Sequence, residues 1–360
     1  MAQNLPHLPD WEQISTNIVR ILGGNPSKFT LQGTNTYLLG TGPQRILIDT
    51  GAGEKKWIDT LRTVLTSQNE PIAVSTCILT HWHHDHLGGV RDLERLCEEL
   101  SLDQAKVYKN QPTWNPDGLI EPSRVHDIAD GQKFSIALSG DSAPLEIQAI
   151  HTPGHAKDHM VFQITSSPDP TEVGALFTAD NVLGHGTAVF EDLHLYLQSL
   201  DLMKRRVVDA VAAQQQSQDG SGSGSKRAFP GHGAVISDAV AKIDEYIAHR
   251  RMREEEALNV LKYGTTTPPN SSEPLVHDSI TRVGDDEAEG DSVAVGGAET
   301  VLGKEWASID MVKVIYRHYP ENLWQPAENG LLMVLDKLRR DGKVVKTSAG
   351  KWRVSEKATL

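Results

Sequence analysis

Residues 80–86 read THWHHDH, and this stretch decides what the rest of the chain is expected to form. It follows directly on the apolar run 73–79, which predicts a buried strand. A turn at the end of a strand splays alternate side chains, so that imidazoles and a carboxylate can converge on two nearby points. Three histidines and an aspartate in this order are rare in an ordinary polar loop, and both residue types bind zinc. The candidate ligands here are His81, His83, Asp85 and His86, whereas His84 is expected to point away.

Three further candidate ligands lie downstream, each in a turn after a predicted strand. His155 ends the sequence TPGH at 152–155, Asp180 follows the predicted strand 175–178, and His232 stands in the sequence PGHG. The glycines let the backbone turn sharply, so that the ligand side chain projects inward. One such histidine is usually an ordinary loop residue, but three candidates in the same context indicate a metal centre. His159 is a candidate to support the site rather than a ligand.

With these motifs in this order, roughly residues 17–250 resemble the metallo-β-lactamase superfamily. The resemblance implies an α/β protein with an αββα sandwich and the activity of a metal-dependent hydrolase. It also implies two zinc ions, one held by His81, His83 and His155, the other by Asp85, His86 and His232, with Asp180 bridging them. Asp85 is both a ligand and a possible proton acceptor by this resemblance, and a zinc-bound hydroxide is the expected nucleophile. Asp49, in the sequence DTG at 49–51, is expected to orient the ligand loop.

Three stretches resemble one branch of the superfamily more specifically. They are ILGGNPSKFTLQGTNTY at 21–37, LGHGTAVFEDL at 183–193 and PENL at 320–323. The branch is that of fungal metallo-β-lactamase-type thioesterases of polyketide biosynthesis, of the atrochrysone carboxyl ACP thioesterase type. It implies hydrolysis of the thioester between a polyketide and the acyl carrier protein domain of a non-reducing polyketide synthase, which is then the expected partner. His185 and Asn35 are weaker candidates for the substrate pocket.

Two details of the sequence bear on the choice of substrate. True β-lactamases typically lack the bridging aspartate, so Asp180 makes β-lactam hydrolysis an unfavoured activity. Ala52 stands where the branch is expected to have a glutamate, in DTGAG at 49–53. This departure removes no ligand, and it therefore bears on contacts to the substrate rather than on metal binding.

Two other functions stay open on the sequence. The same motifs resemble the lactamase-β-like endoribonuclease branch of animals, for which single-stranded RNA is the substrate and partner. The formal net charge of -13 weighs against a nucleic-acid binder, because such binding depends on Lys and Arg meeting phosphate. A third possibility is a non-catalytic winged-helix binding protein with a vestigial hydrolase fold, against which the intact ligand set weighs.

The remaining pattern predicts a metallo-β-lactamase domain at 17–262. The Gln-, Gly- and Ser-rich residues 214–225 are expected to be a flexible loop. Strands are expected at 35–39, 45–49, 73–79, 145–150, 160–165 and 175–178. Helices are expected at 54–65, from Val90 onward, at 193–213 and at 239–261.

Two segments of different composition follow. Residues 265–303 carry eight acidic residues and one basic residue, and we expect an acidic, disordered linker or insertion. Residues 304–357 predict two helices, 309–318 and 326–340, and a hairpin of 343–346 with 351–354, the outline of a small winged-helix-like module. From residue 304 on, eleven basic residues stand against seven acidic ones. This surface is suited to RNA phosphates or to an acidic acyl carrier protein, and it fits a solvated packing domain equally well.

The N-terminal residues and the cysteines indicate the compartment. The first residues, MAQNLPH, have no basic region followed by an apolar one, and no stretch of the chain approaches the ~20 apolar residues of a membrane span. Cys77 and Cys97 are too few for a disulfide framework, and Cys77 is expected to be a small buried hydrophobic residue. We expect a cytoplasmic protein that makes no contact with a membrane.

Overall fold

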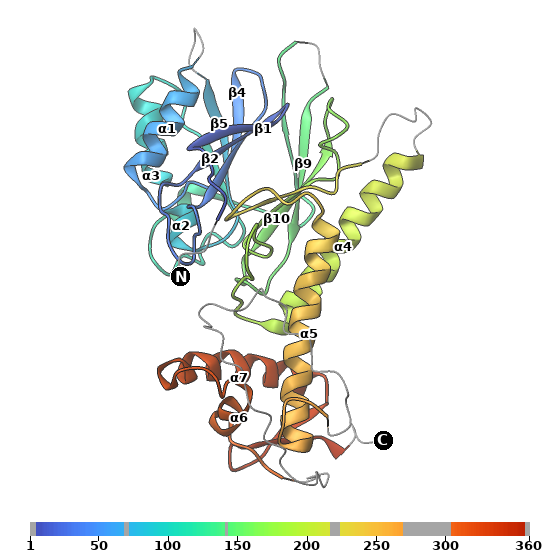
Figure 1. Cartoon of the computed structure of the whole chain (residues 1–360). Helices are drawn as coiled ribbons and strands as arrows, with labels where there is room; N and C mark the ends of the chain where they lie inside the picture. The colour runs from blue at the N-terminus through green and yellow to red at the C-terminus, as the bar shows by residue number, and fades with distance from the viewer. Residues whose placement is uncertain (1–4, 68–71, 141–142, 217–223, 269–303, 357–360) are drawn as a thin grey trace. The chain divides into compact units, whose positions relative to one another are not determined.

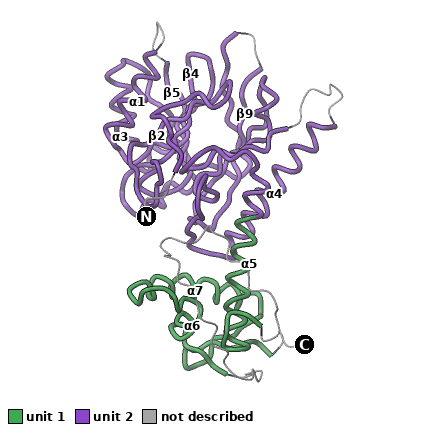
Figure 2. Tube along the Cα trace, viewed as in Figure 1, with its two compact units in different colours: residues 1, 245–360 green, residues 2–244 purple. Residues whose placement is uncertain are grey.

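The computed structural model describes residues 5–67, 72–140, 143–216, 224–268 and 304–356. These residues form two compact units, 2–244 and 245–360 (Figure 2). Helix α5 (Ala239–Tyr263) begins in the first unit and ends in the second. Most of the predicted acidic segment 265–303, and residues 217–223 of the predicted flexible loop, lie outside the described residues. The predicted domain bounds, 17–262 and 304–357, stay a prediction.

The first unit contains a sheet of seven strands and a sheet of five (Figure 1). In the larger sheet the strands lie in chain order; β1 to β4 are antiparallel, and β4 to β7 are parallel. The strands are β1 (Trp11–Ser15), β2 (Ile18–Leu22), β3 (Asn35–Leu39), β4 (Gln44–Ile48), β5 (Ala73–Leu79), β6 (Lys106–Lys109) and β7 (Val125–Asp127). The smaller sheet has the order β12 (Ala228–Pro230), β11 (Leu176–Ala179), β10 (Met160–Ser166), β9 (Leu145–His151) and β8 (Lys133–Ile136).

Strand alternation explains why the two sheets stack. Along β3, Tyr37 and Leu39 belong to the core between the sheets, together with Phe177 of β11. Leu38 faces the other way and joins Trp57 of α1 (Lys55–Leu65) in a second core, which α3 (Val90–Glu99) also lines. Each face of the larger sheet is therefore buried, one by the smaller sheet and one by helices.

A helix also covers the outer face of the smaller sheet. The side chain of Gln163, on β10, donates a hydrogen bond of 2.9 Å to the carbonyl of Arg206 on α4 (Leu193–Gln216). The layers therefore run helix, sheet, sheet, helix, and the predicted αββα sandwich is confirmed. Cys77 is fully buried in the core of the larger sheet and its helices, and both cysteines are free thiols.

The strand directions bring the predicted ligands to one edge of each sheet. Strand β9 is antiparallel to β10, β10 is antiparallel to β11, and β11 is parallel to β12. Strands β9, β11 and β12 therefore run the same way, and their carboxyl ends share one edge. The turns that follow these three strands contain His155, Asp180 and His232, respectively.

The second unit contains the predicted helix, helix and hairpin. They are α6 (Ser308–Ile315), α7 (Trp324–Arg340) and the strands β13 (Val344–Lys346) and β14 (Trp352–Val354). Met311 of α6, Leu335 of α7 and Trp352 of β14 are buried, each no more than 3% exposed. This arrangement confirms the predicted winged-helix-like module. Among the described residues, no helix is long and apolar enough to cross a membrane.

Candidate metal centre

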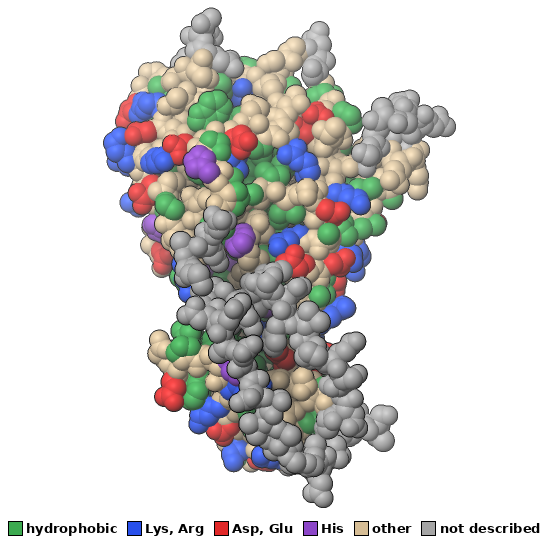
Figure 3. All heavy atoms as spheres, in the orientation of Figure 1, with side chains coloured by type: hydrophobic (Ala, Val, Ile, Leu, Met, Phe, Trp, Pro, Cys, Tyr) green, Lys and Arg blue, Asp and Glu red, His purple; other side chains and the backbone are tan. Residues whose placement is uncertain are grey.

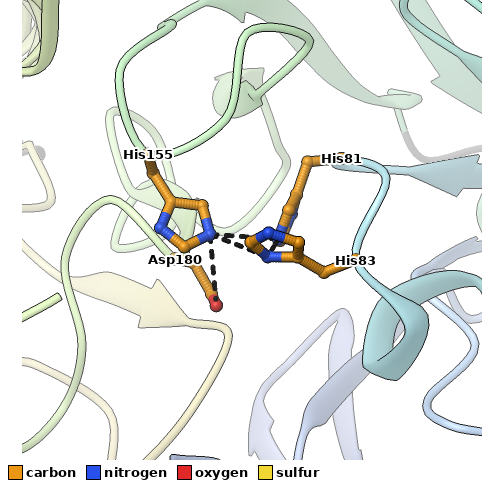
Figure 4. Close-up of side chains that lie close together, drawn as sticks. All are labelled: His81, His83, His155 and Asp180. Carbon is orange, nitrogen blue, oxygen red and sulfur yellow. Dashed lines mark hydrogen bonds and ion pairs between the residues drawn. The ribbon is translucent and has the colours of Figure 1, made fainter. Parts of the chain in front are cut away.

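Four predicted ligands converge at the edge where the strands end (Figure 4). His81 and His83 come from the turn after β5, His155 from the turn after β9, and Asp180 from the turn after β11. Nδ1 of His83 lies 2.9 Å from Nε2 of His81 and 3.0 Å from Nε2 of His155, and the two Nε2 atoms lie 3.3 Å apart. Three imidazoles therefore direct one nitrogen each toward a common point.

The hydrogen bonds behind these rings show which nitrogens carry lone pairs. Nδ1 of His155 donates to the carbonyl of Val189 at 2.8 Å. The Thr80 hydroxyl donates its only proton to Asp49, so it accepts from Nδ1 of His81 at 3.0 Å. When the two rings are neutral, they therefore face each other with unprotonated Nε2 atoms.

Two lone pairs at this separation repel unless a cation lies between them. Around a tetrahedral zinc ion, Zn–N bonds of about 2.0–2.1 Å place two nitrogens about 3.3 Å apart. The 3.3 Å between Nε2 of His81 and Nε2 of His155 matches this spacing, and the distances of 2.9 and 3.0 Å to Nδ1 of His83 are shorter than it. Neutral imidazole is a typical ligand of divalent transition metals, zinc among them, so the donor set suits an ion of this class.

A second cluster consists of Asp85, His86 and His232. Oδ2 of Asp85 lies 3.2 Å from Nε2 of His232 and 3.5 Å from Nε2 of His86. Nε2 of His86 is buried without a hydrogen-bond partner, although its ring is held from behind by Asp49. An unpartnered buried nitrogen beside a carboxylate is what a ligand set for a divalent cation presents.

Asp180 contacts both clusters. Its Oδ1 lies 3.4 Å from Nε2 of His86, and its Oδ2 lies 3.7 Å from Nε2 of His155 and 3.3 Å from Nε2 of His232. Oδ1 is also buried without a hydrogen-bond partner. The structure therefore brings together all seven predicted ligands and places the Asp180 carboxylate within 3.7 Å of histidine nitrogens of both clusters.

The electrostatics of the two clusters differ. Burial first, and the neighbouring histidines next, lower the pKa of His83 to about 4 and hold the pKa of His81 well below its usual value. Burial also opposes protonation of His86, but Asp85, Asp180 and Asp49 outweigh it and raise the pKa of that ring well above 6.5. The second cluster therefore concentrates negative charge, which favours a cation there.

Asp49 supports the ligand turn from behind. Its backbone has φ of 61°, a left-handed conformation that is uncommon for a residue with a side chain. The carboxylate accepts the backbone N–H of Thr80 at 2.8 Å and contacts Nδ1 of His86 at 2.8 Å. One side chain thereby fixes both the start of the ligand turn and the orientation of a ligand ring, which is the role that the resemblance implies for it.

His159 holds Asp180 in a similar way. Nε2 of His159 accepts the backbone N–H of Asp180 at 3.2 Å, so the ring proton lies on Nδ1, which donates to the Thr152 hydroxyl at 3.0 Å. The ring is fully buried and belongs to neither ligand cluster. Its place agrees with a supporting role, which the sequence suggested only from its nearness to His155.

The variant His159→Leu is expected to weaken zinc binding about 10- to 100-fold, because the backbone of Asp180 loses its acceptor. Glutamine can place an amide oxygen near the position of Nε2, so His159→Gln should retain most of the affinity. Competition with a chromophoric chelator measures both variants. Equal affinities for the two variants would show that the acceptor atom is not what matters.

Other predicted residues lie outside the two clusters. His84 is exposed, in agreement with its expected direction, and His185 is exposed in the loop after β11. Asn35 is 1% exposed, and its amide donates to the carbonyls of Pro230 and Gly233 at 2.9 and 2.8 Å. It therefore holds the turn of His232, and its place in a substrate pocket, like that of His185, stays a prediction.

A buried ion pair near the ligand turns was not predicted from the sequence. Nζ of Lys109, the last residue of β6, lies 2.5 Å from Oδ2 of Asp158, and both side chains are fully buried. The ammonium also donates to the carbonyls of Asn110 and Trp114, each at 3.0 Å. The pair ties the loop that contains His155 to the larger sheet, and removing one partner would leave a buried charge uncompensated.

Comparison with known proteins agrees with this arrangement. Residues 29–213 match the metallo-beta-lactamase superfamily, and residues 308–352 match the beta-lactamase associated winged helix domain. The chain is similar to lactamase-like protein nscB of Neosartorya fischeri, with 45% identity over 71% of this chain and 65% of that protein, so it spans just under two thirds of that relative. It is 39% identical to an atrochrysone carboxyl ACP thioesterase of Claviceps purpurea, over 78% of this chain and 76% of that protein.

Two further similarities extend over nearly the whole chain. A beta-lactamase-like protein 2 homolog of Drosophila melanogaster is 34% identical over 94% of this chain and 92% of its own length. The crystal structure of a beta-lactamase domain protein from Burkholderia ambifaria superimposes with a TM-score of 0.62 at 15% identity, covering 98% of each chain, and shows the same fold.

A four-layer sandwich with clustered histidines and aspartates at one edge defines a metal-dependent hydrolase. The chain belongs to the metallo-β-lactamase superfamily and carries that superfamily's associated winged-helix domain at its C-terminal end.

Proposed function

We propose that this chain hydrolyses the thioester that joins a polyketide to the acyl carrier protein of a non-reducing polyketide synthase, and that it uses two zinc ions. The observation that carries the proposal is the similarity to the atrochrysone carboxyl ACP thioesterase over 78% of the chain. The two clusters of this chain also contain all seven of the predicted metal ligands. The acyl carrier protein is then the partner.

The proposed reaction needs water, a polarised carbonyl and no cofactor beyond the metal. Water adds to the carbonyl carbon, the C–S bond breaks, and the products are a carboxylic acid and a thiol. Bound zinc would supply Lewis-acid chemistry, lowering the pKa of water from 15.7 toward ~7 and polarising the carbonyl oxygen. Asp85, which is partly exposed, is the residue of the second cluster best placed to accept the proton that water loses.

The charges of the chain weigh against RNA as the substrate. Acidic and basic side chains are interspersed on the face drawn in Figure 3. Within the winged-helix module, several basic side chains are already paired: Lys337 with Glu254 at 2.6 Å, and Arg339 and Arg340 with Asp336. Paired cations have less positive charge to offer to phosphates, on which nucleic-acid affinity mainly depends.

The proposal predicts that the zinc-loaded protein releases an aromatic polyketide from its carrier protein and leaves single-stranded RNA intact. The variant Asp85→Ala should lose this activity, because it removes a ligand of the second cluster. The measurement is product release by liquid chromatography, with RNA assayed in parallel on a gel. Metal-dependent cutting of RNA together with an inert thioester would replace the proposed function with that of an endoribonuclease.

A further inference from the structure

The loop of residues 184–192 is tied to two of the ligand turns. The carbonyl of Val189 accepts the Nδ1 proton of His155 at 2.8 Å. The carbonyl of Gly154 accepts the backbone N–H of Glu191 at 2.7 Å and that of Asp192 at 3.0 Å. On the other side, the indole N–H of Trp82 donates to Oε1 of Glu191 at 3.3 Å. These hydrogen bonds therefore hold the backbone of the loop in place next to the ligand clusters.

The side chain of Val189, in this loop, is exposed to solvent. It is 63% exposed, whereas the preceding Ala188 is only 5% exposed and the following Phe190 stacks on Tyr196 with ring centroids 5.4 Å apart. A single exposed valine needs no explanation on most surfaces. Here, however, the carbonyl of Val189 accepts a hydrogen bond from a ligand ring, so the backbone at this position is held one residue contact away from the ligand cluster.

A second exposed apolar side chain lies on the loop before β3. Phe29 is 74% exposed, and the hydroxyl of Ser27 accepts its backbone N–H at 3.1 Å. The same loop leads to Thr34, whose hydroxyl donates to Oδ2 of Asp85 at 3.2 Å. Two of the five large hydrophobic residues that are exposed in the described part of the chain therefore lie on loops that contact ligands.

We infer that Val189 contacts the acyl group of the thioester and selects bulky apolar acyl groups, such as aromatic ones, over small ones. The inference rests on the proposed function, because the carbonyl under attack has to lie at the ligand clusters. The group attached to that carbonyl then has to extend past one of the surrounding loops. A loop that presents a fixed apolar side chain gains free energy from an apolar group there and gains little from a methyl group.

The test compares two thioesters of the same thiol, benzoyl- and acetyl-N-acetylcysteamine, with the zinc-loaded full chain. The loss of one methyl-sized apolar contact lowers kcat/KM by about tenfold or more. We therefore expect Val189→Thr, which keeps the shape of the side chain, to reduce the ratio of kcat/KM for benzoyl over acetyl about tenfold. Val189→Asp should reduce it further. The loss should lie mainly in KM, because the contact is made in substrate and transition state alike.

A matched control is available on α4. Val208 is 47% exposed, and it lies 15 residues after the start of the helix, about 22 Å along its axis. Val208→Asp makes the same change away from the ligand turns and should leave the benzoyl-to-acetyl ratio as in the wild type. Zinc content and melting temperature are measured for every variant, so that loss of metal or of folding is seen directly.

The outcomes separate the inference from the proposed function. An unchanged ratio in Val189→Thr and Val189→Asp, with wild-type hydrolysis of both thioesters, would overturn the inference alone. An equal fall in Val208→Asp would do the same. If the zinc-loaded wild type hydrolyses neither thioester, nor a polyketide on its carrier protein, then the proposed function itself is wrong, and the role of Val189 with it.

Discussion

Replacing Asp180 with asparagine is expected to reduce thioester hydrolysis at least about a thousandfold, because the change removes a negative charge that both clusters share. Oδ1 of Asp180 lies 3.4 Å from Nε2 of His86, and Oδ2 lies 3.3 Å from Nε2 of His232. Asparagine keeps the size of the side chain and one oxygen, but it cannot present two anionic oxygens to two cations. The variant should therefore bind fewer zinc ions than the wild type, which metal analysis after dialysis measures.

The control for this variant is Asp103→Asn, the same chemical change at an exposed position after α3. It should keep the zinc content and the activity of the wild type, since surface substitutions of this kind rarely change a protein by more than ~0.5 kcal/mol. An Asp180→Asn protein that holds two zinc ions and hydrolyses thioesters at wild-type rates would show that the two clusters do not depend on a shared carboxylate.

The ligands could be predicted from the sequence because each one lies shortly after a strand, with Asp85 and His86 on the short helix α2 (His84–Leu87) that follows β5. Strand alternation and turn residues are local signals, and the predicted strands 35–39 and 73–79 have the same bounds as β3 and β5. The carboxyl ends of the strands then meet at one edge by topology. Local signals combined with a known order of motifs were therefore sufficient to predict which side chains converge.

The residues that hold the ligands in place could not be predicted in the same way. Strand β6 begins and ends with lysine, a pattern typical of exposed segments, and Lys109 is buried only because Asp158 lies beside it in the fold. Asn35 likewise acts on Pro230 and Gly233, which are distant in sequence. Such pairs are set by tertiary packing, which overrides local propensity, and no signal within a short window of sequence identifies them.

The bounds of the elements show the same limit. The pattern did not predict β1, β2, β6, β7 or β8, all of them strands of five residues or fewer. The predicted helix 193–213 ends three residues before the end of α4 at Gln216. Short strands depend on their neighbours for most of their hydrogen bonds, so their own sequence contains little information about them.

Gly231→Ala is expected to abolish tight zinc binding without removing any ligand. A Cβ atom at this position would lie 2.3 Å from Oδ1 of Asp180, and 3.1 Å from both Cε1 of His86 and the backbone carbonyl carbon of Ala179. Non-bonded carbon and oxygen atoms do not approach each other as closely as 2.3 Å. The carboxylate is the end of a side chain and can rotate away, so the chain should still fold. Rotation, however, takes Asp180 out of reach of both clusters. We expect zinc affinity to fall at least about 100-fold, and thioester hydrolysis to fall with it.

The helix α7 provides the matched control, because Gly330 lies in its interior and a Cβ atom there would meet no other atom within 4 Å. Gly330→Ala should keep zinc and activity and should raise the free energy of unfolding by about 0.5–1 kcal/mol, as alanine is the better helix former. Chelator competition and thermal unfolding of the metal-free proteins separate the two effects. If Gly231→Ala melts far below the wild type without metal, the glycine is needed for folding. If the variant binds zinc as the wild type does, Asp180 tolerates displacement, and its position in the structure is not what the metal requires.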